Sequence, residues 1–98
     1  MQENVQKVLL EMASLLRTYY DTGWGDVYDK LAKCIVVTPD DTARRILASY
    51  GGMGSINDVV LTSGGRPLLE ENDRFDSLRS HLRQLCLKSL SGPSRSGG

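Results

Sequence analysis

The stretch GGMGSINDVVL, residues 51–61, divides the chain into two parts of different character. Three glycines and an Asn-Asp pair precede an apolar run, so helical periodicity ends here and an extended segment begins. Gly51 and Gly52 are expected to close a helix, because a glycine tolerates the left-handed geometry that often follows a last helical residue. Asn57 and Asp58 are expected to hydrogen-bond nearby backbone. The stretch therefore predicts a helix-to-strand corner.

Upstream of this corner, apolar residues recur at steps of three and four, which places them on one face of a helix. One such stripe spans residues 5–19 and a second spans residues 24–35, with a predicted turn at 21–23 between them. Thr38 and Pro39 then predict a short third helix, as its N-cap and first helical residue. The second stripe, expected to face inward, comprises Trp24, Val27, Tyr28, Leu31, Ala32 and Ile35.

Downstream of the corner, the pattern predicts a small β-hairpin. Residues 56–61 have the composition of a short strand, residues 62–65 that of a tight turn, and residues 66–69 that of a second extended piece. Pro67 limits this second piece to an edge position, because proline has no N–H to donate.

A last helix is expected to follow capping residues at 70–73 and to run to about Leu90. The expected fold class is α+β, mostly α, with three N-terminal helices, a small hairpin and a C-terminal helix packed in one layer against them. Residues 1–90 would form a single globular domain. Residues 91–98 would form a flexible Ser/Gly-rich tail, because they carry too little apolar surface to fold. The stripe expected on the last helix is Phe75, Leu78, Leu82, Leu85 and Cys86.

The overall composition limits the classes of partner that we expect. Of the 98 residues, 12 are basic and 12 acidic, so no global field favours nucleic acid, and we expect no nucleic-acid role. No apolar run is long enough to span a bilayer and the first residues lack the features of a signal peptide. We therefore expect a cytoplasmic protein with no membrane contact.

The chemistry-bearing residues are few. Cys34 and Cys86 both fall inside helical patterns and are expected to be free thiols packed in the interior. Two cysteines and the single histidine, His81, cannot fill the four ligand positions of a structural zinc site. His81 and Cys86, five residues apart, would point in different directions on one helix, so no Cys-His pair is expected. We expect no catalytic residue, no metal and no cofactor.

The glycine run of the corner also suggests an alternative, a loop that binds a small ligand or a phosphate. A P-loop needs a closing lysine, and a dinucleotide-binding loop follows a strand and opens a helix, whereas this loop follows a helix and contains no lysine. Backbone N–H groups between Gly51 and Ser55 could still bind an anion with Arg44, Arg45 or Arg66 nearby. The residues that either a ligand or a protein partner would contact are Gly52, Gly54, Ser55, Asn57, Asp58 and Arg66.

The corner, taken with Asn72 and the Asp76-x-Leu78-Arg79 segment downstream, resembles a family of small bacterial proteins known only as a domain of unknown function. The resemblance covers residues 5–87, and Ile56 departs from it where an aromatic residue or leucine is usual. It implies a helical N-terminal half followed by a GGMGSxNDxxL core, but it implies no activity. The matching core positions are Gly51, Gly52, Met53, Gly54, Ser55, Asn57, Asp58 and Leu61.

These observations favour a non-enzymatic bacterial protein that binds another protein, in the manner of a toxin-neutralising immunity protein or a regulatory protein. The partner would then be a toxin encoded nearby. Homodimerisation through the exposed hairpin edge stays open as an alternative mode of association.

Overall fold

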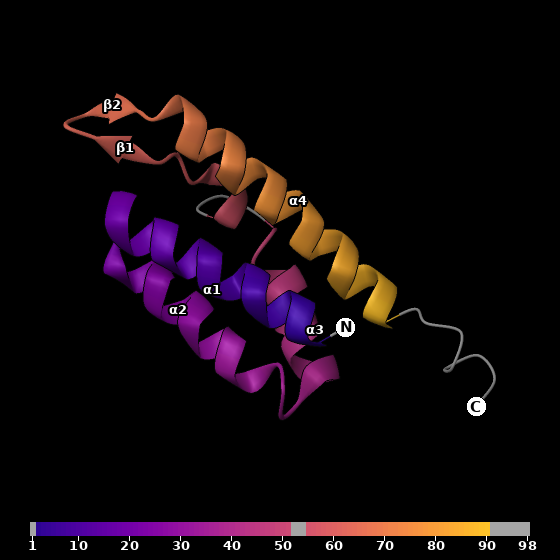
Figure 1. The fold of residues 1–98 in the computed structure, drawn as a ribbon. Coiled ribbons are helices and arrows are strands. Elements are labelled where there is room, and N and C mark those ends of the chain that lie inside the picture. Colours follow the sequence, from indigo (N-terminus) through magenta and orange to yellow (C-terminus); the bar gives the residue numbers. More distant parts are fainter. Residues whose placement is uncertain (1, 52–54, 91–98) are drawn as a thin grey trace, which may run out of the picture.

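The computed structural model describes residues 2–51 and 55–90, and it confirms the expected class, α+β and mostly α (Figure 1). The two strands pair as one antiparallel hairpin, and α4 runs alongside the helices that precede it. Within these ranges no helix combines the length and the apolarity that crossing a membrane requires. In chain order the elements are α1 (Gln2–Tyr19), α2 (Thr22–Cys34), α3 (Pro39–Ala48), the 3-10 helix η1 (Ile56–Asp58), β1 (Thr62–Ser63), β2 (Arg66–Pro67) and α4 (Leu69–Leu90).

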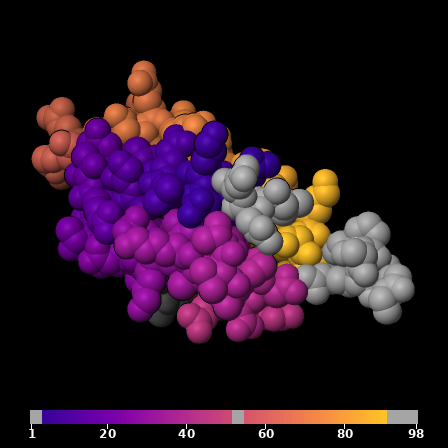
Figure 2. All heavy atoms as spheres, turned by 60° about the horizontal axis from the view of Figure 1, so that its bottom comes forward, coloured from indigo at the N-terminus to yellow at the C-terminus, as the bar shows by residue number. Residues whose placement is uncertain are grey.

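A capping side chain sets the start of α2, and α2 and α3 lie at the surface in Figure 2, purple and magenta. Asp21 caps α2, because its Oδ1 accepts the backbone N–H of Trp24 at 2.7 Å. The turn predicted at 21–23 is therefore shorter, and α2 begins at Thr22. Thr38 and Pro39 occupy the predicted positions at the start of α3, but the Thr38 side chain makes no capping bond.

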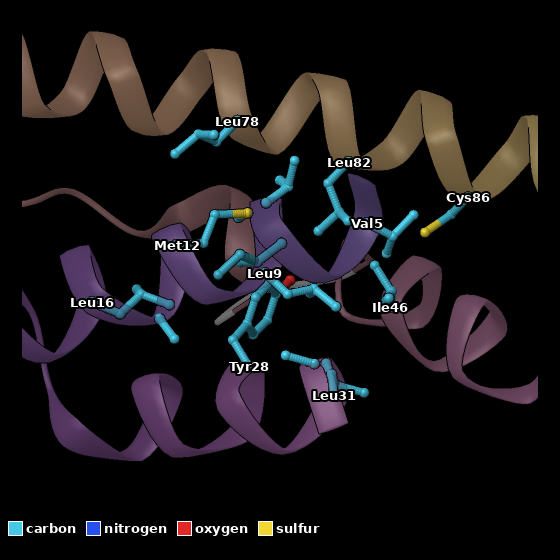
Figure 3. Packing of buried hydrophobic residues seen from close by; sticks show 14 of the residues in the cluster. Val5, Leu9, Met12, Leu16, Tyr28, Leu31, Ile46, Leu78, Leu82 and Cys86 are labelled. Carbon is cyan, nitrogen blue, oxygen red and sulfur yellow. The ribbon is translucent and has the colours of Figure 1, made fainter. Parts of the chain in front are cut away.

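The core is built around α1, which lies between α2 and α4 in Figure 3. Leu9 and Met12 of α1 are fully buried, and they lie among side chains that come from both of the other helices. Four residues of the predicted α4 stripe are buried and Leu85 is partly buried. Burying such side chains is the main source of stability for a chain of this size.

The end of α3 differs from the prediction. The helix ends at Ala48, and the N–H groups of Tyr50 and Gly51 donate to the carbonyls of Leu47 and Ala48, three residues earlier in each case. This tightening toward 3-10 geometry closes the helix without a left-handed residue. Gly51 does not have a positive φ, so the prediction that it closes the helix through left-handed geometry is wrong; Gly52 lies outside the described residues.

The hairpin is present and β2 lies within the second piece predicted at 66–69, but the first strand comes later than predicted. Thr62 pairs with Pro67 and Ser63 with Arg66, and Gly64 and Gly65 form the turn between them. Both glycines have positive φ, +58° and +80°, as a two-residue hairpin turn that matches the strand twist requires. Residues 56–61, predicted as a strand, instead form η1 and a segment outside the two strands, in which the Leu61 carbonyl accepts the N–H of Leu68 at 3.0 Å.

The last helix begins at Leu69, before the predicted caps at 70–73, because the Leu68 carbonyl already accepts the N–H of Asn72 at 2.9 Å. It ends at Leu90, as predicted. Residues 91–98, the predicted flexible tail, lie outside the described residues.

Close contact between α1 and α2 at Gly25 gives the first testable prediction. A Cβ at this buried position would overlap Cγ of Arg17 and approach the Ala13 carbonyl oxygen to 3.3 Å. Both Gly25→Ala and Gly23→Ala gain the same helix propensity, so the difference between them measures the overpacking at Gly25. We expect Gly25→Ala to be less stable by about 1–3 kcal/mol, the typical cost of overpacking. Gly23 is the matched control, since it is exposed on the same helix. Equal unfolding free energies for the two variants in urea would contradict this packing.

Candidate functional site

Ser55 and Asn57, two of the predicted site residues, stabilise the backbone of the corner. The Ser55 hydroxyl accepts the N–H of Asn57 at 3.3 Å and so caps η1. The Asn57 side chain donates to the carbonyl of Tyr50 at 2.8 Å, and the N–H of Ile56 donates to the carbonyl of Ser49 at 2.9 Å. The expected turn-locking role of Asn57 is therefore seen, and the bond joins the end of α3 to η1.

The remaining members of the predicted set do not gather at one place. Asp58 is exposed on η1 beside Asn57, and its N–H donates to the carbonyl of Ser55 at 3.0 Å. Arg66 is exposed on the hairpin, at the opposite end of the molecule from α3 in Figure 1, so Arg66 does not lie with the α3 arginines. Gly52 and Gly54 lie outside the described residues, so binding by the loop stays a prediction.

Asn72 on α4 has a role in the corner that periodicity did not indicate. Its Oδ1 accepts the N–H of Leu61 at 2.9 Å, and its Nδ2 donates to the carbonyls of Leu61 at 2.9 Å and Leu68 at 2.7 Å. The side-chain amide thus bonds both backbone groups of Leu61, as a neighbouring strand would. Only the family resemblance, which included Asn72, signalled its importance.

Arg79 is the second link between α4 and the corner. Its Nη1 donates to the carbonyl of Ile56 at 2.9 Å, its guanidinium also pairs with Asp76, and it lies 5.4 Å from the centre of the Phe75 ring. The Tyr50 hydroxyl in turn donates to the carbonyl of Arg79 at 2.5 Å. The side chain is only 16% exposed, so Arg79 is largely covered where α4 meets the corner.

The buried titratable groups stay uncharged at neutral pH. Burial raises the pKa of Tyr28 to about 12 and the pKa of the Cys86 thiol to about 11, and it raises the pKa of Tyr50 well above its usual range. A thiol protonated at pH 7 is a poor nucleophile. The hydroxyls of Tyr28 and Tyr50 hydrogen-bond to Ser49 and to the Arg79 carbonyl, and Cys86 packs in the core.

The cysteine, histidine and carboxylate side chains do not gather at one place. Cys86 is buried and Cys34 half-buried, and both are free thiols. His81 is exposed on α4. Within residues 2–51 and 55–90, no group of three or more His, Cys, Asp or Glu side chains is placed to hold a metal ion.

A surface feature of another kind is an apolar groove between α2 and α3, which we call the α2/α3 groove. It consists of a hollow of about 630 Å³ beside the start of α2 and a second hollow of about 260 Å³ further along the same helix, and both hollows include Val27, Arg45 and Ser49 in their walls. The α2 wall is formed by Trp24, Val27, Leu31 and Cys34, and the α3 wall includes Arg45 and Ala48.

The groove exists because the apolar arc of α2 is wider than its contact with α1. Tyr28 and Ala32 are fully buried. On an adjoining face, Trp24, Val27, Leu31 and Cys34 follow one another at steps of three, four and three, and only Leu31 of these four is buried. Val27 is 47% exposed, so its predicted place in the core is wrong.

A hydrogen-bonded floor joins the two walls. The Ser49 hydroxyl donates to the Ile46 carbonyl at 2.6 Å and lies 2.7 Å from the Tyr28 hydroxyl. Because the single Ser49 proton is used in the first bond, the Tyr28 hydroxyl is the donor in the second. Trp24 packs edge-on against the Tyr28 ring, with 5.9 Å between the ring centres, so the indole is held in a fixed position at the rim.

Comparison with known proteins adds a family but no activity. The family model described as "Domain of unknown function (DUF6966)" matches residues 17–69, a range that includes α2, α3 and the corner. Searches of curated proteins and of solved structures returned no match.

The Asn72 bonds give the second testable prediction. Replacing Asn72 with Ala leaves the N–H of Leu61 without its partner, and we expect a loss of about 2–3 kcal/mol of unfolding free energy in urea. Asn4→Ala is the matched control, because Asn4 is exposed on α1, and this change should lie within about 0.5 kcal/mol of the native chain. A loss for Asn72→Ala no larger than that of the control would show that Asn72 does not hold the corner.

Proposed function

We propose that this chain, which belongs to the DUF6966 family of domains of unknown function, is a non-enzymatic module that binds another protein. The α2/α3 groove is the observation that carries this proposal. An apolar surface with a fixed tryptophan at its rim is typical of protein-binding sites, in which aromatic anchors supply much of the binding energy.

The organisation of the corner supports the same role. Ser55, Asn57, Asn72 and Arg79 all bond backbone groups, which is the pattern of residues that maintain a scaffold. The buried tyrosines and Cys86 are protonated at neutral pH, so they are poorly suited to act as bases or nucleophiles. A scaffold of this kind would present the groove in a fixed geometry.

The particular form of the role that we propose is that of a bacterial cytoplasmic immunity or regulatory protein, whose partner is encoded beside its own gene. The proposal follows from the small size of the domain and from its balanced charge, which leaves recognition to a local surface. Binding through such a groove can occlude a functional surface of a larger protein without any chemical step.

The third prediction concerns this partner. The full chain, mixed with each purified protein encoded next to its gene, should form a stoichiometric complex with one of them, with a Kd of about 1 μM or tighter by calorimetry. If that partner is a toxin, the complex should also lose its toxic activity. If none binds and instead inorganic phosphate or a nucleotide raises the Tm, the alternative of a ligand-binding Gly51–Ser55 loop would replace this proposal.

A further inference from the structure

We propose that the α2/α3 groove binds one amphipathic, acidic helical segment of the partner, with apolar side chains on one face and carboxylates beside them. This inference rests on the proposed function and adds the place and the chemistry of recognition. Its supports are the length of the groove, its apolar anchors and its unpaired positive charge.

The shape of the groove fits a peptide segment. Its wall on α2 extends from Trp24 to Cys34, which at 1.5 Å per residue is about 15 Å, or close to three helical turns. Two hollows in a row can receive two side chains that are one or two turns apart on a bound helix. The groove is open to solvent, so a small molecule would stay largely exposed, whereas a helix can lay one face into it.

The apolar anchors lie along the groove in one row. Trp24 is fixed against Tyr28 at one end, Val27 is nearly half exposed in the middle, and Leu31 closes the floor beside Cys34. Burying an exposed valine and the outer face of an indole releases water from a surface that nothing else in the described chain covers. The partner face must therefore be apolar where it meets these residues.

The charged residues around the groove determine which side chains the partner carries beside its apolar face. Arg45 and Lys30 line the groove, and neither makes an ion pair within the described part of the chain. The adjacent Arg44, by contrast, pairs with Asp41.

The acidic side chains of α2 form ion pairs away from the groove. Asp26 and Asp29 both pair with Arg17 on α1, and Asp29 also pairs with Lys33. The one acid that lines the groove, Asp21, lies at its end and caps α2. A partner that places carboxylates beside Arg45 and Lys30 would gain charge-assisted hydrogen bonds, whereas a basic segment would be repelled.

The fourth prediction uses Trp24, which is the only tryptophan of the chain and therefore reports on the groove alone. The probe is a tryptophan-free amphipathic peptide of about four helical turns, with leucines along one face and glutamates on the others. Titration into the full chain should shift the Trp24 emission to shorter wavelength, with a Kd below about 1 mM. The same peptide with lysine in place of glutamate should bind at least tenfold more weakly.

Two variants locate the contact. Arg45→Glu should weaken the glutamate peptide at least tenfold and reduce its preference over the lysine peptide, whereas Arg83→Glu, a reversal at an exposed site on α4, should have no effect. Val27→Asp should abolish binding of the glutamate peptide. Because Val27 and Arg45 are exposed, both variants should keep the native Tm within a few degrees, which verifies that they fold.

Each other outcome overturns the inference in a distinct way. No emission change with the glutamate peptide, or equal binding of the two peptides, would exclude an acidic segment in this groove. Concentration-dependent dimerisation of the chain that Val27→Asp abolishes would assign the groove to a second copy. If a partner found by the gene-neighbour experiment binds Val27→Asp and Arg45→Glu as well as the native chain, the proposed function stands and the groove assignment fails.

Discussion

Residues 55–61 alternate between buried and exposed positions and lie outside the two strands, and the fold depends on how their backbone polar groups are satisfied. Ile56, Val59 and Leu61 point into the core, so this segment cannot move out to water without removing three core side chains. An unpaired backbone group in such a place costs as much as a lost hydrogen bond. Asn72 and Arg79 on α4 supply the missing partners, which is why α4 is joined to α3 through this segment as well as by direct packing.

The need to satisfy these backbone groups also explains the residues of the corner, which leaves the function to another surface. Ser55 and Asn57 hold the short turn of η1, and Leu61 fills the core while Asn72 bonds its backbone. The side chains of Val27 and Arg45, which line the groove between α2 and α3, make none of the hydrogen bonds described for the corner, and for this reason we propose the groove as the binding surface.

Much of the fold could be predicted because helices depend on local spacing. The steps of three and four located α1, α2 and α4, and Thr38 with Pro39 located the start of α3. The corner was harder, because residues 59–61 have strand composition but Leu61 bonds to an asparagine eleven residues later, a long-range contact that no local pattern reveals. Val27 was placed in the core because periodicity shows that a face is apolar but not which neighbour covers it. The groove was missed for the same reason, and an apolar arc on α2 wider than one helix contact was the signal that could have found it.

The most direct test of the central claim is native-state hydrogen exchange at the Leu61 amide. This N–H lies in a segment without regular secondary structure, yet Asn72 accepts it within a part of the fold that can open only when α4 separates from the corner. The account predicts that Leu61 exchanges with the same opening free energy as buried amides of α4 such as that of Leu78. Exchange of Leu61 as fast as that of the exposed hairpin amides would show that the side chains of α4 do not hold this backbone, and would contradict the account.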